Sequence, residues 1–181
     1  MTKERKIKII AIFAIFLLTF PFHFMYEWFP NKATAIFFPV NESIWEHMKL
    51  IFTATAVWSI LELLLIKKLQ LHFHNIASNF VITSLFNIIL FLTLYLPIHH
   101  FFGEILPVTL VLLFLTITIS QIFSYFLLSR KENKKIELVF LILIPLVITG
   151  FGYLTYHPIK NDLFLDFQSQ KYGISTLVQE K

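Results

Sequence analysis

The chain has 181 residues, of which 57% are hydrophobic and 17% aromatic, and its mean hydropathy is +0.74. A water-soluble domain of this length is excluded, because it cannot bury so much apolar surface, and the excess must face lipid. The lack of cysteine excludes disulfides, thiolate metal sites and thiol nucleophiles, and the net charge of +4 is explained by membrane topology without a nucleic-acid partner.

Five segments are long and apolar enough to cross a hydrocarbon core about 30 Å thick as helices. They are residues 9–25, 43–66, 76–98, 105–128 and 138–156. No small-residue cleavage site follows the first segment, so we expect it to stay as a membrane helix and not to be removed as a signal peptide. The sequence therefore predicts an all-α, multi-pass transmembrane helix bundle in the cell membrane, formed by residues 1–156, with membrane lipids as its surroundings.

Basic residues set the expected orientation. Ten of the fifteen lie before the first span, between the second and third, or between the fourth and fifth: Lys3, Arg5, Lys6, Lys8, Lys67, Lys68, Arg130, Lys131, Lys134 and Lys135. Because cytoplasmic loops carry the excess of Lys and Arg, we expect the amino terminus inside and the carboxyl terminus outside.

Two segments outside the spans are also informative. Residues 29–39 are bounded by prolines and rich in aromatics, which predicts a loop or a short interfacial helix. Residues 157–181 form a polar extracytoplasmic tail, which we expect either to lie in water or to fold back over the outer ends of the spans.

The second span begins with a polar motif, residues 41–49. It contains Asn41, Glu42, Ser43, Trp45, Glu46, His47 and Lys49. Ser43 and Glu46 fit the S-x-x-E capping box, so helix capping is one interpretation of these two residues. A cap does not explain Glu42, His47 and Lys49 together, and a face carrying them costs several kcal/mol if turned to hydrocarbon. We therefore expect the motif to face the bundle interior or a wet cavity.

Other outer residues can join this motif. His23 and Glu27 are four apart at the end of the first span, so on a continuous helix they share one face and suit a common metal ion. Anchoring at the membrane interface, beside Tyr26 and Trp28, is the alternative. Imidazoles and carboxylates together predict a divalent metal such as zinc, with His23, Glu27, Glu42 and His47 as ligands, or acid and base catalysis by Glu46, His47 and Asp166.

Glu62 lies near the cytoplasmic end of the second span without a nearby basic residue before Lys67. It is expected to reach towards Lys67 or Lys68, to pair with a polar group such as Gln121 or Ser124, or to be protonated. Polar residues of the third and fourth spans are interpreted as hydrogen-bonding contacts between helices. Nucleotide-binding, zincin and hydrolase-elbow motifs are missing from the chain.

Three blocks of the sequence resemble a family of small bacterial integral membrane proteins without an established function. The blocks are residues 23–28, residues 38–50 with the N-E-S-x-W-E-H pattern, and the tail from Leu163 to Asp166 with Tyr172-Gly173-Ile174. The resemblance implies a compact helical membrane fold and no activity. In the tail, this chain has Asp166-Phe167-Gln168-Ser169-Gln170 where the family usually has a D-P-x-T-G turn.

The chain is also similar, more loosely, to the membrane hydrolase superfamily that contains alkaline ceramidases and adiponectin-type receptors. Those proteins hold zinc with residues from helix ends, but they have seven spans and an H-x-x-x-H element that this chain lacks. The likeness implies a metal-dependent hydrolase that acts on a lipid-derived substrate.

Three functions remain open from the sequence. The first is such a hydrolase or metal-binding protein with its site outside. The second is a small proton-coupled transporter that uses Glu42, Glu46, Lys49 and Glu62 along the second span. The third is a structural or regulatory membrane subunit. A homodimer is compatible with each.

Overall fold

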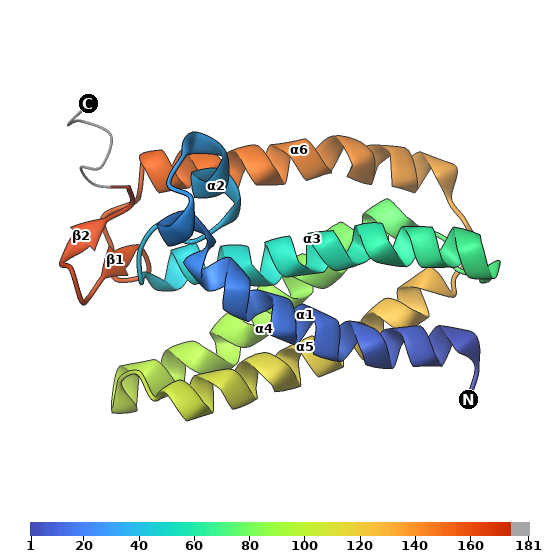
Figure 1. Ribbon diagram of the computed structural model, residues 1–181, viewed down its shortest axis with the longest axis horizontal. Helices are drawn as coiled ribbons and strands as arrows, with labels where there is room; N and C mark the ends of the chain where they lie inside the picture. The colour runs from blue at the N-terminus through green and yellow to red at the C-terminus, as the bar shows by residue number, and fades with distance from the viewer. Residues whose placement is uncertain (175–181) are drawn as a thin grey trace.

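The computed structural model describes residues 1–174 and shows long helices lying side by side (Figure 1). In that range the helices are α1 (Lys3–Trp28), α2 (Lys32–Phe37), α3 (Ile44–Leu69), α4 (Ile76–Phe102), α5 (Leu106–Leu128) and α6 (Lys134–Tyr156). Strands β1 (Leu165–Asp166) and β2 (Lys171–Tyr172) pair antiparallel in the tail. Within residues 1–174, five helices are long and apolar enough to cross a membrane, which confirms the all-α bundle and supports a multi-pass membrane protein.

The predicted spans agree with α1, α3, α4, α5 and α6, and differ from them by a few residues at the ends. Ser43 and Ile105, which the prediction included, are the N-caps of α3 and α5. Residues 32–37 form the predicted short helix, α2. Asn31 begins it with a capping box, because its side chain accepts from the Thr34 N–H while the Thr34 hydroxyl accepts from the Asn31 N–H.

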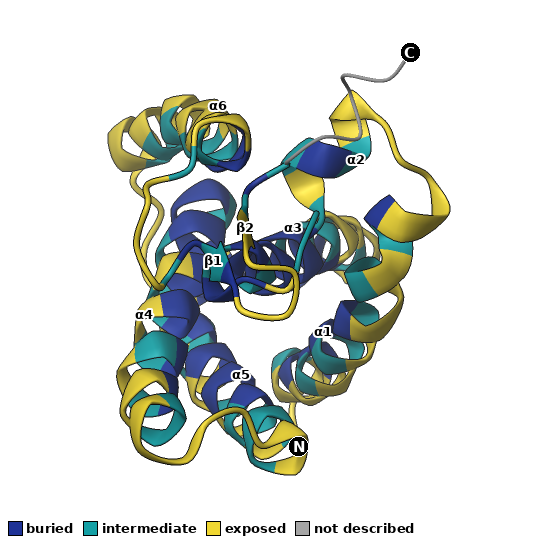
Figure 2. Cartoon of the chain, turned by 90° about the vertical axis from the view of Figure 1, so that its left-hand side faces the viewer, coloured by how far each residue is buried: buried dark blue, intermediate teal, exposed yellow. Residues whose placement is uncertain are grey.

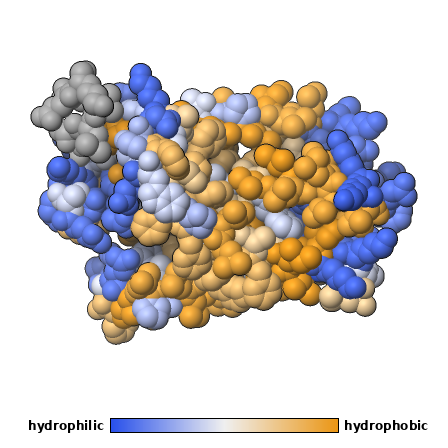
Figure 3. All heavy atoms as spheres, in the orientation of Figure 1, coloured by the Kyte–Doolittle hydropathy of each residue, from blue (hydrophilic) through white to orange (hydrophobic). Residues whose placement is uncertain are grey.

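The long helices alternate in direction, so the bundle has two distinct ends (Figure 1). We call them the amino-terminal end, with residues 1–3 and the turns 70–75 and 129–133, and the tail end, with residues 29–43, 103–105 and 157–174. Hydrophilic side chains gather at both ends and a hydrophobic band separates them (Figure 3). This is the pattern of a protein surrounded by lipid. The side of the membrane that each end faces stays a prediction.

Helix α3 lies at the centre of the bundle, between α1 and α4 (Figure 2). In its most apolar 18-residue stretch 56% of the residues are buried, against 17% for α6 at the edge. The central position explains why α3 carries polar groups: its Glu46, Lys49 and Glu62 face protein and not lipid.

Glu62 forms a buried polar network at the amino-terminal end. The Nζ of Lys8 on α1 lies 2.7 Å from Oε1 and 2.9 Å from Oε2 of Glu62. The same ammonium donates to Gln121 Oε1 at 3.3 Å and to Ser124 Oγ at 2.6 Å on α5. Lys8, counted from the sequence among the basic residues that set the orientation, is thus only 5% exposed, and its charge is matched inside the bundle.

Removing one partner of this pair should destabilise the protein strongly. Glu62→Gln leaves the buried Lys8 ammonium without a counter-ion, which costs about 3–5 kcal/mol of unfolding free energy. The double variant Lys8→Met, Glu62→Leu should recover most of that loss, since no uncompensated charge remains. Unfolding in mixed detergent micelles measures both, with the exposed Lys67→Ala as the control. Equal losses in the single and the double variant would show that the pair's charges do not matter to stability.

Candidate metal centre at the tail end

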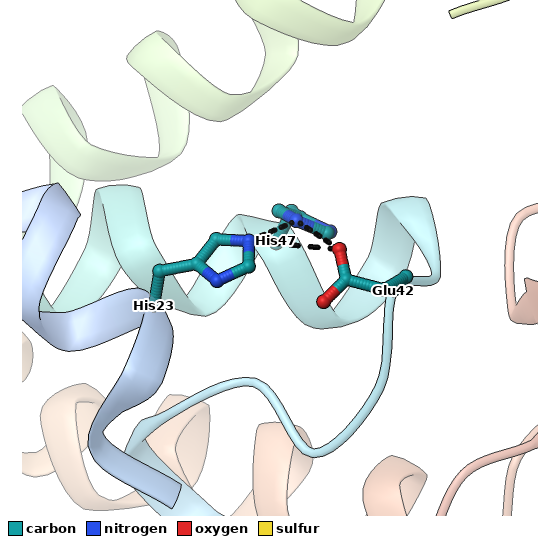
Figure 4. A group of neighbouring side chains, drawn as sticks. All are labelled: His23, Glu42 and His47. Atoms are coloured by element: carbon teal, nitrogen blue, oxygen red, sulfur yellow. Dashed lines mark hydrogen bonds and ion pairs between the residues drawn. The ribbon is translucent and has the colours of Figure 1, made fainter. Parts of the chain in front are cut away.

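Three side chains from two helices and a loop meet at the tail end of the bundle (Figure 4). His23 comes from the last turns of α1, Glu42 from the loop before α3, and His47 from the first turn of α3. His23 Nε2 lies 3.0 Å from His47 Nε2, and Glu42 Oε2 lies 3.6 Å and 3.4 Å from these two nitrogens. The sequence analysis proposed all three as metal ligands, and the fold brings them together.

The triangle has the dimensions of a tetrahedral metal site. Ligand atoms about 2.0–2.1 Å from zinc, at tetrahedral angles, lie about 3.3 Å from one another. The three observed separations, 3.0, 3.4 and 3.6 Å, lie on both sides of that value. An ion among these atoms therefore needs only small movements of the side chains.

A backbone contact orients the His47 ring. Its Nδ1 lies 2.8 Å from the carbonyl oxygen of Ser43, one turn earlier on the chain. A carbonyl only accepts, so this contact places a proton on Nδ1, and the Nε2 lone pair is available to a ligand when the ring is neutral. Metal-bound histidines generally have such a partner on the second ring nitrogen. A hydrogen bond between the two imidazoles also uses this lone pair, and is the arrangement for a site without metal.

The carboxylate of Glu42 is kept charged by its neighbours. Hydrogen bonds and the charges of His23 and His47 hold its pKa well below the ordinary 4.5, although partial burial opposes this. The Glu42 side chain is 41% exposed and the two imidazoles 28%, so the site is open on one side. One side of the triangle is therefore accessible to solvent.

Directly behind this site lies a buried ion pair between Glu46 and Lys49. Lys49 Nζ is 2.6 Å from Glu46 Oε2 and donates to the Ala35 carbonyl on α2 at 2.7 Å and to Thr155 Oγ1 on α6. The Thr155 hydroxyl donates to Glu46 Oε1 at 2.9 Å, and the Val40 N–H donates to Glu46 Oε2 at 3.1 Å. The pair therefore links α3 to α2, to α6 and to the loop before α3 by hydrogen bonds.

Only half of the expected capping box forms at α3. Ser43 caps the helix by accepting from the Glu46 N–H at 3.3 Å, as expected. The Glu46 carboxylate does not return to Ser43, because Lys49 and Thr155 hold it inside the bundle. The Ser43 N–H donates instead to Asn41 Oδ1 at 2.9 Å. The first turn of α3 is thus fixed by Asn41 and Ser43, and the Glu46 carboxylate accepts hydrogen bonds from Lys49 and Thr155 inside the bundle.

The part of the tail that the structure describes, residues 157–174, folds back over the motif, one of the two arrangements expected from the sequence; residues 175–181 lie outside the described range. Asn41 Nδ2 donates to the Gly173 carbonyl at 2.9 Å, and the Trp45 N–H donates to the Leu163 carbonyl at 2.9 Å. The Trp45 ring stacks on Phe164, with centroids 4.8 Å apart. Gly173 has φ +55°, and a Cβ there meets the Thr155 carbonyl oxygen and lies 2.9 Å from Pro158 Cγ, so a side chain does not fit.

Asp166 closes the tail and does not reach the triangle. Its Oδ1 accepts from the N–H groups of Gln168 and Ser169, and its Oδ2 accepts from Ser169 Oγ at 2.7 Å and from the Glu42 N–H at 3.4 Å. Burial works against the charged form, but these hydrogen bonds together lower the pKa of Asp166 below its ordinary 3.8. Asp166 therefore builds the turn between β1 and β2 and holds the backbone beside Glu42.

Several predicted site residues lie apart from the triangle. Glu27 is exposed at the end of α1, outside the group of three. Glu62 lies at the opposite end of the bundle. Two buried polar residues, Lys8 and Thr155, were not predicted as parts of these networks. A threonine near the end of an apolar helix gives no local signal, and Lys8 differs from the other basic residues before the first span only in lying directly next to the apolar segment 9–25.

The Asp166 contacts predict a pH-dependent tail. A carboxyl with a lowered pKa stabilises the fold above its unfolded pKa, and the contribution is lost as the pH falls from 3.8 through the lower folded value. The variant Asp166→Asn should lack this contribution to stability at neutral pH. Hydrogen exchange of residues 163–173 in detergent should accelerate roughly tenfold, as expected for about 1–2 kcal/mol of lost hydrogen bonding.

The exposed Asp162 provides the matched control for this measurement. Asp162→Asn should leave exchange in the tail unchanged. Equal acceleration in both variants would mean that the tail responds to net charge and not to the Asp166 contacts.

Comparison with known proteins identifies a family to which the chain is similar. The profile of a family of unknown function (DUF6512) matches residues 1–174. No match was found among curated proteins or among solved structures. The expectation of an uncharacterised family is therefore confirmed, whereas a bacterial origin and the likeness to the membrane hydrolase superfamily stay predictions.

Proposed function

Because the chain belongs to the family of unknown function DUF6512, we propose its role from geometry: it is a membrane protein that binds a divalent transition metal, zinc by preference, through His23, Glu42 and His47. The observation that supports this most is the triangle of ligand atoms separated by 3.0–3.6 Å. We place the site on the extracytoplasmic side, from the distribution of basic residues.

The ligand set suits zinc and Fe(II), and the tetrahedral spacing of the ligand atoms favours zinc. Two imidazole nitrogens and one carboxylate oxygen match catalytic zinc sites, which keep a fourth position for water or substrate. Calcium and magnesium prefer oxygen ligands only, and the chain has no cysteine to select copper(I) or an iron–sulfur cluster. The partial exposure of all three side chains gives the fourth position access from outside.

Hydrolysis of a lipid-derived substrate is the activity we propose for this site. Zinc in such a site supplies an activated water at neutral pH. The site lies at the tail end of the lipid-facing helices, where a substrate with an apolar chain has its polar group. Glu46 and Asp166, proposed from the sequence as catalytic, are assigned here to positioning, because both carboxylates are already saturated by Lys49, Thr155 and the tail.

Metal binding is testable on the purified protein. The wild-type chain should bind one Zn²⁺, and His23→Ala and His47→Ala should each abolish stoichiometric binding, measured by elemental analysis and titration calorimetry. Substitution with Co²⁺ should give the intense visible absorption of a tetrahedral complex. Each variant is checked for unchanged thermal unfolding without metal.

His100→Ala is the matched control, since this histidine is exposed and lies outside the triangle. It should bind zinc like the wild type. If the wild type binds no more metal than His47→Ala, the triangle is a hydrogen-bonded cluster and the proposal is wrong.

The hydrolase activity has a separate test. The protein in micelles should release fatty acid from short-chain acyl ester or amide lipids, and a chelator or His47→Ala should reduce the rate at least a hundredfold. Zinc should restore the chelated wild type but not the variant. Stoichiometric zinc without turnover on either lipid class would retain the metal site and remove the hydrolase.

The transporter alternative has less support from the geometry. Its proposed stations, Glu46 and Glu62, are each paired with a buried lysine, at opposite ends of α3. Glu46 is held by a lysine and two further donors, and Glu62 by a lysine. Such a carboxylate is a poor relay for protons, because leaving that geometry strands a buried charge.

A further inference from the structure

A groove of about 330 Å³ lies between α1 and α5, at the opposite end of the bundle from the metal site. Its apolar walls are formed by Ile9 and Ile12 on α1 and by Ile122 and Phe126 on α5. Its volume is at the lower end of the range for pockets that hold small molecules. Water gains little in an apolar groove, so an apolar occupant is required.

Arg5 lies at one end of the groove. Arg5, Ile9 and Ile12 are spaced i, i+4 and i+7, so they share one face of α1 over about 10 Å. Arg5 is thus one turn beyond the apolar wall, towards the amino-terminal end. Among residues 1–174 its guanidinium forms no ion pair, and it is exposed. A free guanidinium above an apolar groove suits a phosphate that carries an acyl chain.

The floor of the groove is electrically neutral. Lys8 and Gln121 line it, but the Lys8 ammonium is already bonded to Glu62, Gln121 and Ser124. It therefore does not compete with Arg5 for an anion. An acyl chain in the groove covers this network and separates it from headgroup water, which strengthens the buried pair.

We propose that this groove is a binding site for an anionic phospholipid, with the phosphate on Arg5 and one acyl chain against Ile9, Ile12, Ile122 and Phe126. The basic residues of the amino-terminal end favour the leaflet rich in anionic lipid. This inference is independent of the metal site.

Native mass spectrometry of the protein, released from vesicles of equal parts phosphatidylglycerol and phosphatidylcholine, tests the proposal. The wild type should retain one phosphatidylglycerol in preference to phosphatidylcholine. Arg5→Ala should weaken that preference about fivefold, as expected for the loss of one basic contact near the surface. Ile122→Trp fills the groove and should abolish retention of both lipids.

Two matched variants separate the site from general effects. Lys6→Ala removes a neighbouring exposed charge, and Ile10→Trp adds the same bulk on a part of α1 that does not line the groove. Both should behave like the wild type. Equal retention of the two lipids by the wild type, an equal effect of Lys6→Ala and Arg5→Ala, or normal retention by Ile122→Trp would each overturn the proposal.

Discussion

The ion pair between Glu46 and Lys49 is the constraint on which the tail end of the bundle depends. A lysine and a glutamate that are each 1% exposed are stable only when every donor and acceptor has a partner. The partners come from α2, α6 and the loop before α3. The buried charges are therefore compatible with only one arrangement of these segments, which are far apart in the sequence. Apolar packing alone does not select that arrangement.

The geometry of the triangle formed by His23, Glu42 and His47 follows from that arrangement. Glu46 accepts from the Val40 N–H, Asn41 joins the Ser43 N–H to the Gly173 carbonyl, and the loop between them presents Glu42 to the two imidazoles. His47 has its ring oriented by the Ser43 carbonyl. The other acid and amide side chains around the site thus hold the backbone, and the Glu42 carboxylate and the two histidine rings contact one another.

Each end of α3 carries a buried glutamate whose charge must be neutralised, and a lysine does this at both ends. At the amino-terminal end, Glu62 is neutralised by Lys8 from α1, and the apolar groove between α1 and α5 lies beside the pair. At the tail end, Glu46 is neutralised by a lysine of its own helix, and the triangle of His23, Glu42 and His47 lies at the same end. Both pairs are hydrogen-bonded to a neighbouring helix, so each also fixes how α3 packs.

The sequence by itself determined the helices, because a hydrocarbon core needs long apolar segments and these are local properties of the chain. It also identified His23, Glu42 and His47 as candidates, since ionisable groups beside apolar spans are unusual. Only the tertiary structure decided which polar residues meet. Glu27 lies one turn from His23 yet is exposed and outside the triangle, while Lys8 and Thr155 join networks with residues 54 and 109 positions distant. Such pairings depend on how α1, α3 and α6 rotate and pack, and no local pattern in the chain encodes that rotation.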